Sequence, residues 1–209
     1  MYFETVEPGT KRVLDALVRS GIAADFYLAE GTALAIELGH RRSIDLDFFS
    51  TGDFRTTDLK EALSGIGDLV VVGEEEGTLH VTIDGVKVSF LRYRYPLLYP
   101  LVDFEGTALA DERDIAAMKI DAISSRGSRK DFIDLFVLLE KYPLRELLGY
   151  FEKKFAGIGF NTLHILKSLV YFDDAEGEPM PMMLRDIDCE TVKETVVKMV
   201  MAYEREEEV

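Results

Sequence analysis

The chain has 209 residues, of which 47% are hydrophobic, so it is long enough for one large domain or two small ones with a packed core. Its 24 Lys and Arg against 39 Asp and Glu give a formal net charge of −15, which opposes broad, sequence-independent binding to a phosphate backbone. No apolar run reaches the roughly 18 residues of a membrane helix, and the start MYFETVEPGT has no signal-peptide pattern. We therefore expect a cytoplasmic protein that does not contact a membrane.

The first part of the chain alternates between helical and extended patterns. Apolar residues at helical spacing predict helices, and short runs of β-branched and aromatic residues predict strands. In chain order, the predicted elements are a helix over 11–20, a strand over 25–29, a helix that opens at Gly31-Thr32 and ends at Gly39, an acidic strand over 44–49, a helix ending at Leu63, and strands over 68–73, 78–83 and 86–93. Asp84-Gly85 between the last two strands is a strong hairpin signal.

After the Pro-Leu-Leu-Tyr-Pro segment at 96–100, the pattern becomes helical for the rest of the chain. The acidic end EREEEV is expected to be the solvated end of the last helix. We predict an α/β (α+β) fold class, with an α/β domain over 1–100 and a helical domain over 101–209 that packs on it. The predicted helices cover about 111–125, 129–141, 144–156, 161–172 and 188–206.

Asp45 and Asp47 lie two residues apart in an otherwise apolar strand. Buried carboxylates are costly unless they are paired or bind a cation. Because alternate residues of a strand face the same side, we expect both carboxylates together, with Ile44, Leu46 and Phe48 facing the core. Two such carboxylates suit Mg²⁺ (or Mn²⁺), which proteins hold with one or two carboxylates plus substrate phosphates. A solvated or capping pair at a strand end is the alternative, and it is the commoner case for an isolated Asp-x-Asp pattern.

Gly31 and Thr32 precede the aspartates at the start of the predicted helix. Gly31 lets the backbone approach a phosphate closely, and Thr32 with the helix N-terminus offers a hydroxyl and free N–H donors to an anion. A Gly-Thr pair before a helix is also often a simple cap. The order of strand, Gly-Thr turn, helix and acidic strand within one segment favours the phosphate-binding interpretation.

The segment GTALAIELGHRRSIDLDFF resembles the signature of the AbiEii/AbiGii type of abortive-infection toxins, which runs Gly-Gly-Thr-Ala-Leu, a spacer, then Arg-x-Ser-x-Asp-x-Asp-Phe. That family is similar to the minimal nucleotidyltransferases of the polymerase β superfamily. The resemblance implies a nucleotidyltransferase-fold mixed sheet flanked by helices and followed by a helical C-terminal half. A second block, residues 114–142, is similar to the family's lysine motif and the following Arg-Asp-x-x-Asp-Leu motif.

In this resemblance Lys119 matches the family's lysine and Asp134 its aspartate. Lys119 would neutralise nucleotide phosphates, and Asp134 would orient it or act on the acceptor. A helix hairpin that turns at 126–128 can bring Asp134 back towards Lys119. The other implied site residues are the metal ligands Asp45 and Asp47, the phosphate-cradling Gly31 and Thr32, and Arg41 and Ser43, which would support the acidic strand or a phosphate.

Residues around the second block have simpler explanations. Ser128 followed by Asp131 resembles a capping box, so we expect Asp131 to serve the helix start. Arg126, Arg129 and Lys130 form a basic cluster that is either a solvated helix end or a local patch for a polyanion.

Two positions depart from the family pattern. Glu30 stands where the family has its first glycine, which puts a negative charge beside the proposed phosphate site. Ser89 stands where nucleotidyltransferases commonly carry a third carboxylate, so a full two-metal site is not expected. We expect His40 to pack or to form hydrogen bonds, and we assign no role to His80 or His164 because neither has partner residues at a recognisable spacing.

The resemblance implies a Mg²⁺-dependent nucleotidyltransferase that moves a nucleoside monophosphate from a nucleoside triphosphate to an acceptor, with pyrophosphate leaving. It also implies the toxin of a type IV-like bacterial toxin–antitoxin or abortive-infection system, with a cognate antitoxin as partner. The expected acceptor is RNA, such as a tRNA end, or a protein, and the net charge of −15 makes RNA less favourable. Two alternatives stay open: transfer to a small molecule, as in antibiotic-modifying enzymes, and a nucleotide-binding or interaction protein without turnover, which Glu30 and Ser89 motivate.

Overall fold

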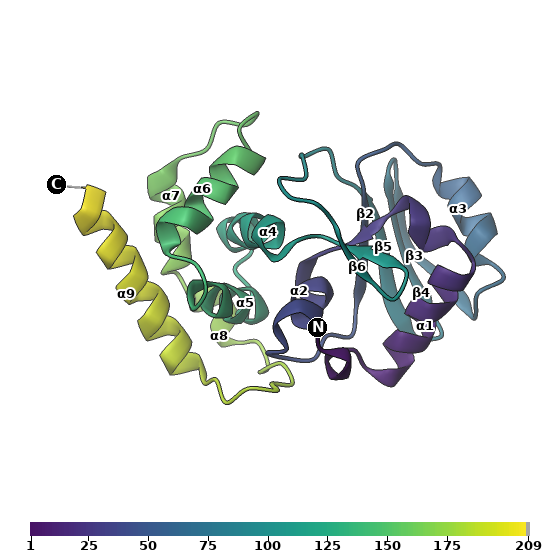
Figure 1. Ribbon diagram of the computed structural model, residues 1–209, viewed down its shortest axis with the longest axis horizontal. Coiled ribbons are helices and arrows are strands. Elements are labelled where there is room, and N and C mark those ends of the chain that lie inside the picture. Colours follow the sequence, from purple (N-terminus) through teal and green to yellow (C-terminus); the bar gives the residue numbers. More distant parts are fainter. Residues whose placement is uncertain (208–209) are drawn as a thin grey trace. The chain divides into compact units, whose positions relative to one another are not determined.

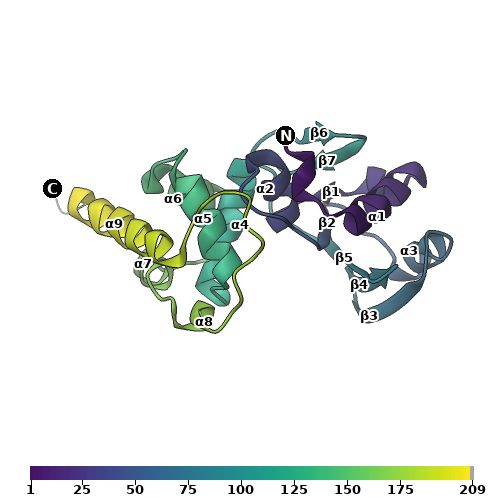
Figure 2. The same ribbon diagram turned by 90° about the horizontal axis from the view of Figure 1, so that it is seen from below.

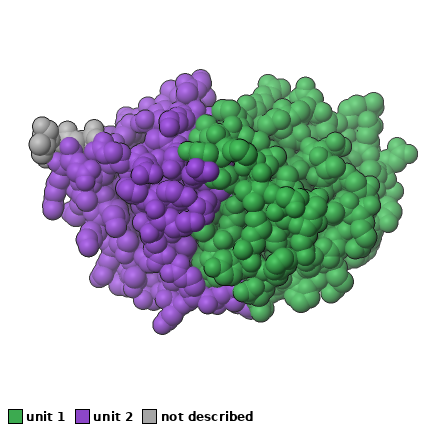
Figure 3. Space-filling view, viewed as in Figure 1, with its two compact units in different colours: residues 1–111 green, residues 112–209 purple. Residues whose placement is uncertain are grey.

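The computed structural model describes residues 1–207, which form two compact units (Figure 3). The first unit spans Met1–Asp111 and the second begins at Glu112. In the part of the chain that the structure describes, no helix is both long enough and apolar enough to cross a membrane. The last two residues of the predicted acidic end EREEEV lie outside the described residues.

The first unit is built on a mixed sheet with the strand order β3-β4-β5-β2-β1-β7-β6 (Figures 1 and 2). The β2–β5 and β1–β7 pairs are parallel and the other pairs are antiparallel, which confirms the predicted fold class. The strands are β1 (Tyr27–Leu28), β2 (Leu46–Ser50), β3 (Leu69–Glu75), β4 (Thr78–Ile83), β5 (Val86–Arg92), β6 (Val102–Phe104) and β7 (Thr107–Leu109). The helices are η1 (Phe3–Thr5), α1 (Pro8–Arg19), η2 (Ile22–Asp25), α2 (Glu30–Leu38) and α3 (Thr56–Leu63).

The predicted order of strand, helix and acidic strand is present as β1, α2 and β2. Helix α2 ends at Gly39, whose φ of 69° is left-handed and therefore suits glycine. The predicted hairpin joins β4 to β5 through Asp84 and Gly85, both of which have positive φ, as the tight turn of a two-residue hairpin requires. Local turn chemistry was therefore sufficient to locate these elements.

One face of the sheet forms the core of the first unit. Phe48 of β2 and Phe90 of β5 are Cα partners, are fully buried, and stack with ring centroids 5.4 Å apart. Phe26, directly after η2, packs edge-on against Phe90 at 5.0 Å. Since successive strand residues face opposite sides, the residues between these aromatic side chains must face away from this core.

Two expectations for this unit are wrong. Ile44 is 57% exposed rather than buried with Leu46 and Phe48, because β2 begins only at Leu46 and the strand alternation does not extend back to Ile44. The chain after residue 100 is not helical throughout, since β6 and β7 form a hairpin that belongs to the first unit. Glu105 and Gly106 in its turn both have positive φ, and strands of three residues show too little alternation to be recognised in the sequence.

The described part of the second unit is helical, and all its helices except α8 match predicted ones (Figure 1). Helix α4 packs against α5, α6 and α7, and α9 packs against the same three helices. The helices are α4 (Glu112–Ser125), α5 (Arg129–Leu139), α6 (Leu144–Lys154), α7 (Thr162–Leu169), α8 (Asp173–Glu176) and α9 (Cys189–Glu207).

Candidate functional site

The two predicted metal-binding aspartates lie at the start of β2. Asp47 is the second residue of the strand, Asp45 comes directly before the strand, and both are half-buried. The Cα partner of Asp47 on the parallel strand β5 is Ser89. Asp47 therefore faces away from the aromatic core. That the Asp45 carboxylate faces the same side as Asp47 stays a prediction.

The N-terminus of α2 is hydrogen-bonded directly to the backbone of both aspartates. The N–H of Ala29 donates to the carbonyl oxygen of Asp47 at 3.0 Å, and the hydroxyl of Thr32 donates to the carbonyl oxygen of Asp45. The first N–H groups of a helix have no partner within the helix and carry partial positive charge. The start of α2 is thus held against the backbone of the segment that carries the two aspartates.

The hydroxyl groups of Thr32 and Ser43 maintain this arrangement. Their oxygens lie 2.8 Å apart, and because a carbonyl oxygen only accepts, the Thr32 proton goes to Asp45 and Ser43 donates to Thr32. The backbone N–H of Ser43 donates to the carbonyl oxygen of Thr5 at 2.9 Å. Both hydroxyl groups are therefore used within the protein, which leaves the backbone of this turn as the part that can contact a phosphate.

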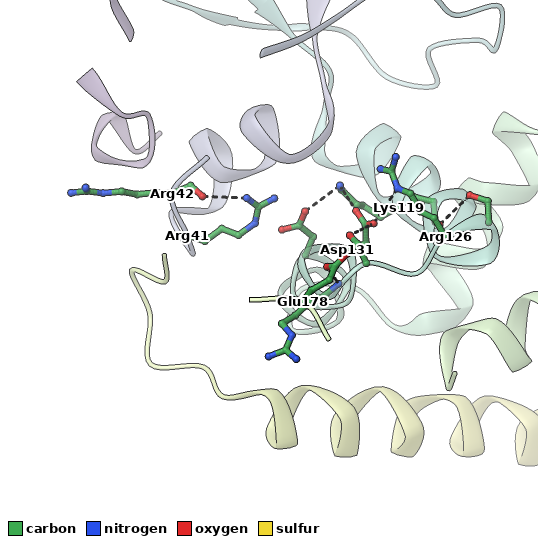
Figure 4. Close-up of polar contacts among 11 residues, drawn as sticks. Arg41, Arg42, Lys119, Arg126, Asp131 and Glu178 are labelled. Atoms are coloured by element: carbon green, nitrogen blue, oxygen red, sulfur yellow. Dashed lines mark hydrogen bonds and ion pairs between the residues drawn. The ribbon is translucent and has the colours of Figure 1, made fainter. Parts of the chain in front are cut away.

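Gly31 lies directly under the guanidinium of Arg41. A Cβ atom at Gly31 would overlap Nη2 of Arg41 and lie 3.5 Å from its Cζ, so only glycine permits this approach. Arg41 is 3% exposed, and its Nη1 donates to the carbonyl oxygen of Arg42 at 3.2 Å (Figure 4). A delocalised positive charge is thus placed at the first turn of α2, where it adds to the attraction for an anion.

Glu30, the departure from the family pattern, has an unusual backbone conformation. Its φ is 58°, in the left-handed region that glycine adopts without the steric cost of a Cβ atom. The first glycine of the family motif therefore fits the conformation of this position better than glutamate does.

The second unit contains a buried cluster of opposite charges at the α4–α5 hairpin. Nζ of Lys119 on α4 lies 2.9 Å from Oδ1 of Asp131 on α5 (Figure 4). The same Nζ lies 3.2 Å from Oδ2 of Asp134, also on α5. None of the three side chains is more than 1% exposed. The hairpin thus brings Asp134 to Lys119, as expected from the sequence.

Asp131 has a larger part in this cluster than the sequence indicated. Ser128 makes no side-chain hydrogen bond to the helix backbone and instead donates its hydroxyl to Oδ2 of Asp131 at 2.6 Å. Burial alone would raise the pKa of Asp131, but the charge of Lys119 and the hydrogen bonds from Ser128 and Lys119 outweigh it, so the pKa is lowered. Asp131 lies in the first turn of α5, where the sequence placed it at the helix start, and it is also the nearer carboxylate to Lys119.

The basic cluster predicted near this hairpin is only partly exposed to solvent. The Arg126 side chain is 60% exposed, with Nε 3.5 Å from Asp131. The guanidinium of Arg129 donates to the carbonyl oxygens of Ala175 at 3.1 Å and Glu176 at 2.7 Å. Arg129 therefore holds the segment around α8, which leaves less positive charge for a polyanion.

His80, to which the sequence assigned no role, lies on the same face of the sheet as Asp47. It is the Cα partner of Ser89, which in turn is the partner of Asp47, and its Nδ1 lies 3.1 Å from Oγ of Ser89. The sequence did not reveal this alignment, because strand register is not visible in the chain order. His40, in contrast, is fully buried, as expected for a packing residue.

A hollow in the first unit lies away from these residues. It has a volume of about 720 Å³ and is lined by residues of η2, the end of β2, the following loop and α3, among them Asp25, Asp53 and Asp58. None of the predicted site residues lines it.

The acidic pair suits Mg²⁺ that is held jointly with a substrate. Carboxylate oxygens are the ligands that Mg²⁺ prefers, and two of them leave coordination positions for water and phosphate oxygens. Among the described residues, no group of three or more His, Cys, Asp or Glu side chains is placed to hold a metal ion. The available donors therefore fit a two-carboxylate site that the substrate completes.

Comparison with known proteins agrees with the fold and the motifs. The family described as "Nucleotidyl transferase AbiEii toxin, Type IV TA system" matches residues 12–109. An uncharacterized protein of Aquifex aeolicus is 42% identical over 174 residues, which cover 80% of this chain and 84% of that protein.

Two solved structures share the fold at low sequence identity. A putative nucleotidyltransferase from Helicobacter pylori has a TM-score of 0.58 and 16% identity, with 99% of this chain and 97% of that chain covered. The MenT4 nucleotidyltransferase toxin from Mycobacterium tuberculosis H37Rv has a TM-score of 0.57 and 14% identity, with 93% and 84% covered. The fold is thus that of the nucleotidyltransferases. The chain belongs to the AbiEii family of nucleotidyltransferase toxins.

Proposed function

We propose that this protein transfers a nucleoside monophosphate from a nucleoside triphosphate to an acceptor and releases pyrophosphate, with Mg²⁺ (or Mn²⁺) as cofactor. The observation that most supports this function is the pair of hydrogen bonds that join the start of α2 to the backbone of Asp45 and Asp47. They keep an anion-binding helix end beside two carboxylates that suit Mg²⁺. The negative charge of a triphosphate would be neutralised from both sides.

Each residue of the first unit then has a defined task. Asp45 and Asp47 hold the cation, which when bound orients and polarises the phosphates. Gly31 lets a phosphate approach the backbone N–H groups at the start of α2. The residues that fix this turn or add positive charge to it are Thr32, Ser43 and Arg41.

We assign Lys119 and Asp134 of the second unit to the same reaction, as the family motif implies. Lys119 supplies positive charge for the phosphates, and Asp134, 3.2 Å away, orients its ammonium group. Asp131 binds the same ammonium group at 2.9 Å.

Family membership supports a biological role as the toxin of a type IV toxin–antitoxin system, with a cognate antitoxin as partner. The proposed acceptor is RNA, such as a tRNA end, or a protein. A formal net charge of −15 favours a protein acceptor over contact with a long phosphate backbone.

Labelling with α-phosphate-labelled nucleotides tests this function. The purified protein is incubated with each labelled triphosphate and Mg²⁺, together with bulk tRNA, with cell protein, with no added acceptor, or with cationic small molecules. Label in one class of acceptor supports transfer and identifies that class. Asp45→Asn and Asp47→Asn should each remove the label, because the amide keeps the shape of the carboxylate but loses the charge that holds Mg²⁺.

Asp103→Asn on β6 is the matched control, since Asp103 is an exposed carboxylate in the same unit and has no assigned task. This variant should label as the wild type does. If the wild type transfers label to no acceptor but still binds nucleotides, the protein is a nucleotide-binding protein without turnover. If an Asp45→Asn/Asp47→Asn double variant labels at the wild-type rate, the metal site is assigned to the wrong residues.

A further inference from the structure

A row of polar side chains crosses three adjacent strands of the first unit at one level. Asp47 of β2 is the Cα partner of Ser89 of β5, and Ser89 is the Cα partner of His80 of β4. Partner residues on neighbouring strands project to the same face of a sheet. With neighbouring strands about 4.8 Å apart, the Cα atoms of His80 and Asp47 are separated by roughly 10 Å.

This row is accessible from solvent and internally connected. Asp47 and Ser89 are half-buried and His80 is exposed, whereas Leu79 and Val81 on either side of His80 are buried on the opposite face. Nδ1 of His80 lies 3.1 Å from Oγ of Ser89. When Nδ1 carries no proton, it accepts the proton of the Ser89 hydroxyl.

Strand β3 leaves the edge of the imidazole uncovered. The residue opposite His80 is Gly73, next to a register shift between Val71 and Gly73. A Cβ atom at Gly73 would lie 3.6 Å from Cδ2 of His80, so a side chain there would cover the ring edge. Bulges and glycines of this kind are common where a strand passes beside a functional group.

Two charged residues of β3 and β5 share the face of His80. They are Lys87, two residues before Ser89 on β5, and Glu75 on β3, whose Cα partner is Thr78. Both Lys87 and Glu75 are exposed. One positive and one negative charge thus lie in the rows next to that of His80, and neither stands between His80 and Ser89.

We propose that Ser89 and His80 take the proton from the acceptor, which attacks through a hydroxyl group. This proposal rests on the nucleotidyl transfer proposed above. As the acceptor oxygen bonds to the α-phosphorus, its proton passes to Oγ of Ser89, and the Ser89 proton passes to Nδ1 of His80. The bond between the α-phosphorus and the bridging oxygen breaks, and its electron pair leaves with pyrophosphate.

In this arrangement Ser89 contacts the acceptor hydroxyl, and His80 is a positioning residue that acts through Ser89. His80→Ala and His80→Gln should each lower kcat by about 100-fold, the lower range for general-base catalysis, with little change in the KM for the triphosphate. His164→Gln on α7 is the matched histidine control and should behave as the wild type does.

Rescue by a carboxylate separates a chemical role from a structural one. Ser89→Asp places a base directly beside Asp47, so the double variant His80→Ala/Ser89→Asp should regain much of the lost kcat. Because a carboxylate at position 89 can also act on the metal, the reference is Ser89→Asp with His80 intact. A chemical role for His80 predicts that His80→Ala no longer lowers kcat in the Ser89→Asp background, whereas a structural role predicts that it still does. If His80→Ala keeps the wild-type kcat while the wild type transfers label, the proposal is overturned.

A measurement without turnover tests the geometry of the row. Mn²⁺ bound by the wild-type protein should broaden the imidazole NMR signals of His80, given the separation of roughly 10 Å between the His80 and Asp47 Cα atoms. The broadening should disappear in the Asp45→Asn/Asp47→Asn variant. Sharp His80 signals in Mn²⁺-bound wild type would contradict the proposed row, whereas absence of label transfer in the wild type would instead reject the proposed function.

Discussion

Nζ of Lys119 lies 2.9 Å from Oδ1 of Asp131, and both side chains are at most 1% exposed. The second carboxylate near the same ammonium group, Asp134, is equally buried at 3.2 Å. Charges removed from water are tolerated only while they are paired, so loss of one partner costs more here than at the surface. This cluster therefore links the stability of the helical unit to residues that the family motif assigns to the reaction.

Asp131→Ala should lower the free energy of unfolding by about 3 kcal/mol, because Lys119 stays buried with one carboxylate fewer. Urea denaturation measures the change. The matched control is Glu140→Ala, which removes the exposed partner of Arg185 at 2.7 Å and should cost less than about 1 kcal/mol. If both variants lose the same free energy of unfolding, burial does not determine how much the Lys119–Asp131 pair contributes to stability.

The stability of the wild type should fall in acid partly through Asp131. Burial raises its pKa, but the Lys119 charge and the hydrogen bonds from Ser128 and Lys119 bring it below the ordinary value of 3.8. A carboxyl group with a lowered pKa contributes stability that is present above the unfolded value and is lost as pH falls through the folded value. The stability difference between the wild type and Asp131→Asn should therefore shrink below about pH 4. Urea titrations of both proteins at pH 7, 5 and 3 measure this difference. The same difference at all three pH values would contradict the expectation.

Thr32→Val should reduce nucleotidyl transfer without unfolding the protein. The valine keeps the buried shape but removes the hydrogen bonds to Asp45 and Ser43, so the start of α2 is held less firmly beside the aspartates. An unpaired buried acceptor costs about 1–3 kcal/mol, which should appear in thermal or urea unfolding. Thr32→Ser keeps the hydroxyl and is the control. If Thr32→Val transfers label as fast as Thr32→Ser, the hydroxyl does not position the site.

Replacement of Glu30 separates its backbone strain from its charge. Glu30→Gly and Glu30→Ala both remove the carboxylate, but only glycine adopts a φ of 58° without steric cost, so the glycine variant should be more stable by about 1 kcal/mol. Both variants should bind the triphosphate more tightly than the wild type, because a negative charge at the phosphate turn is gone. Nucleotide titrations and urea unfolding measure the two effects.

Glu105 provides the control for this pair, since its φ of 50° is similar and it lies in the β6–β7 turn. Glu105→Gly and Glu105→Ala should repeat the difference in stability and leave nucleotide affinity unchanged. Unchanged nucleotide affinity in both Glu30 variants would show that Glu30 does not oppose the triphosphate.

Elements with a strong local signal were predictable from the sequence. The Asp84-Gly85 turn, the glycine that ends α2 and the apolar periodicity of α4 to α6 depend on neighbours close in the chain, and all of them are present in the structure. The acidic pair and the Gly-Thr segment were found in the same way, because their residues lie within one short strand, helix and strand segment.

Three features could not be predicted from the sequence, because segments far apart in the chain determine them. Ile44 is exposed since pairing with β5 begins at Leu46, and the β6–β7 strands exist because β7 pairs with β1 far earlier in the chain. In the sequence, Asp131 resembles a capping residue, whereas in the structure the α4–α5 hairpin places it beside Lys119.

The sequence by itself determined the family motifs, the class of fold and the residues suited to a cation and a phosphate, since these follow from residue type and short spacing. Only the tertiary structure decided which residues are neighbours across the sheet. The β2–β5–β4 register puts Ser89 beside Asp47 and His80 beside Ser89, although His80 is 33 positions from Asp47 in the chain. Strand register is set by the packing of whole buried faces rather than by local sequence, so this row of polar side chains becomes visible only in the folded protein.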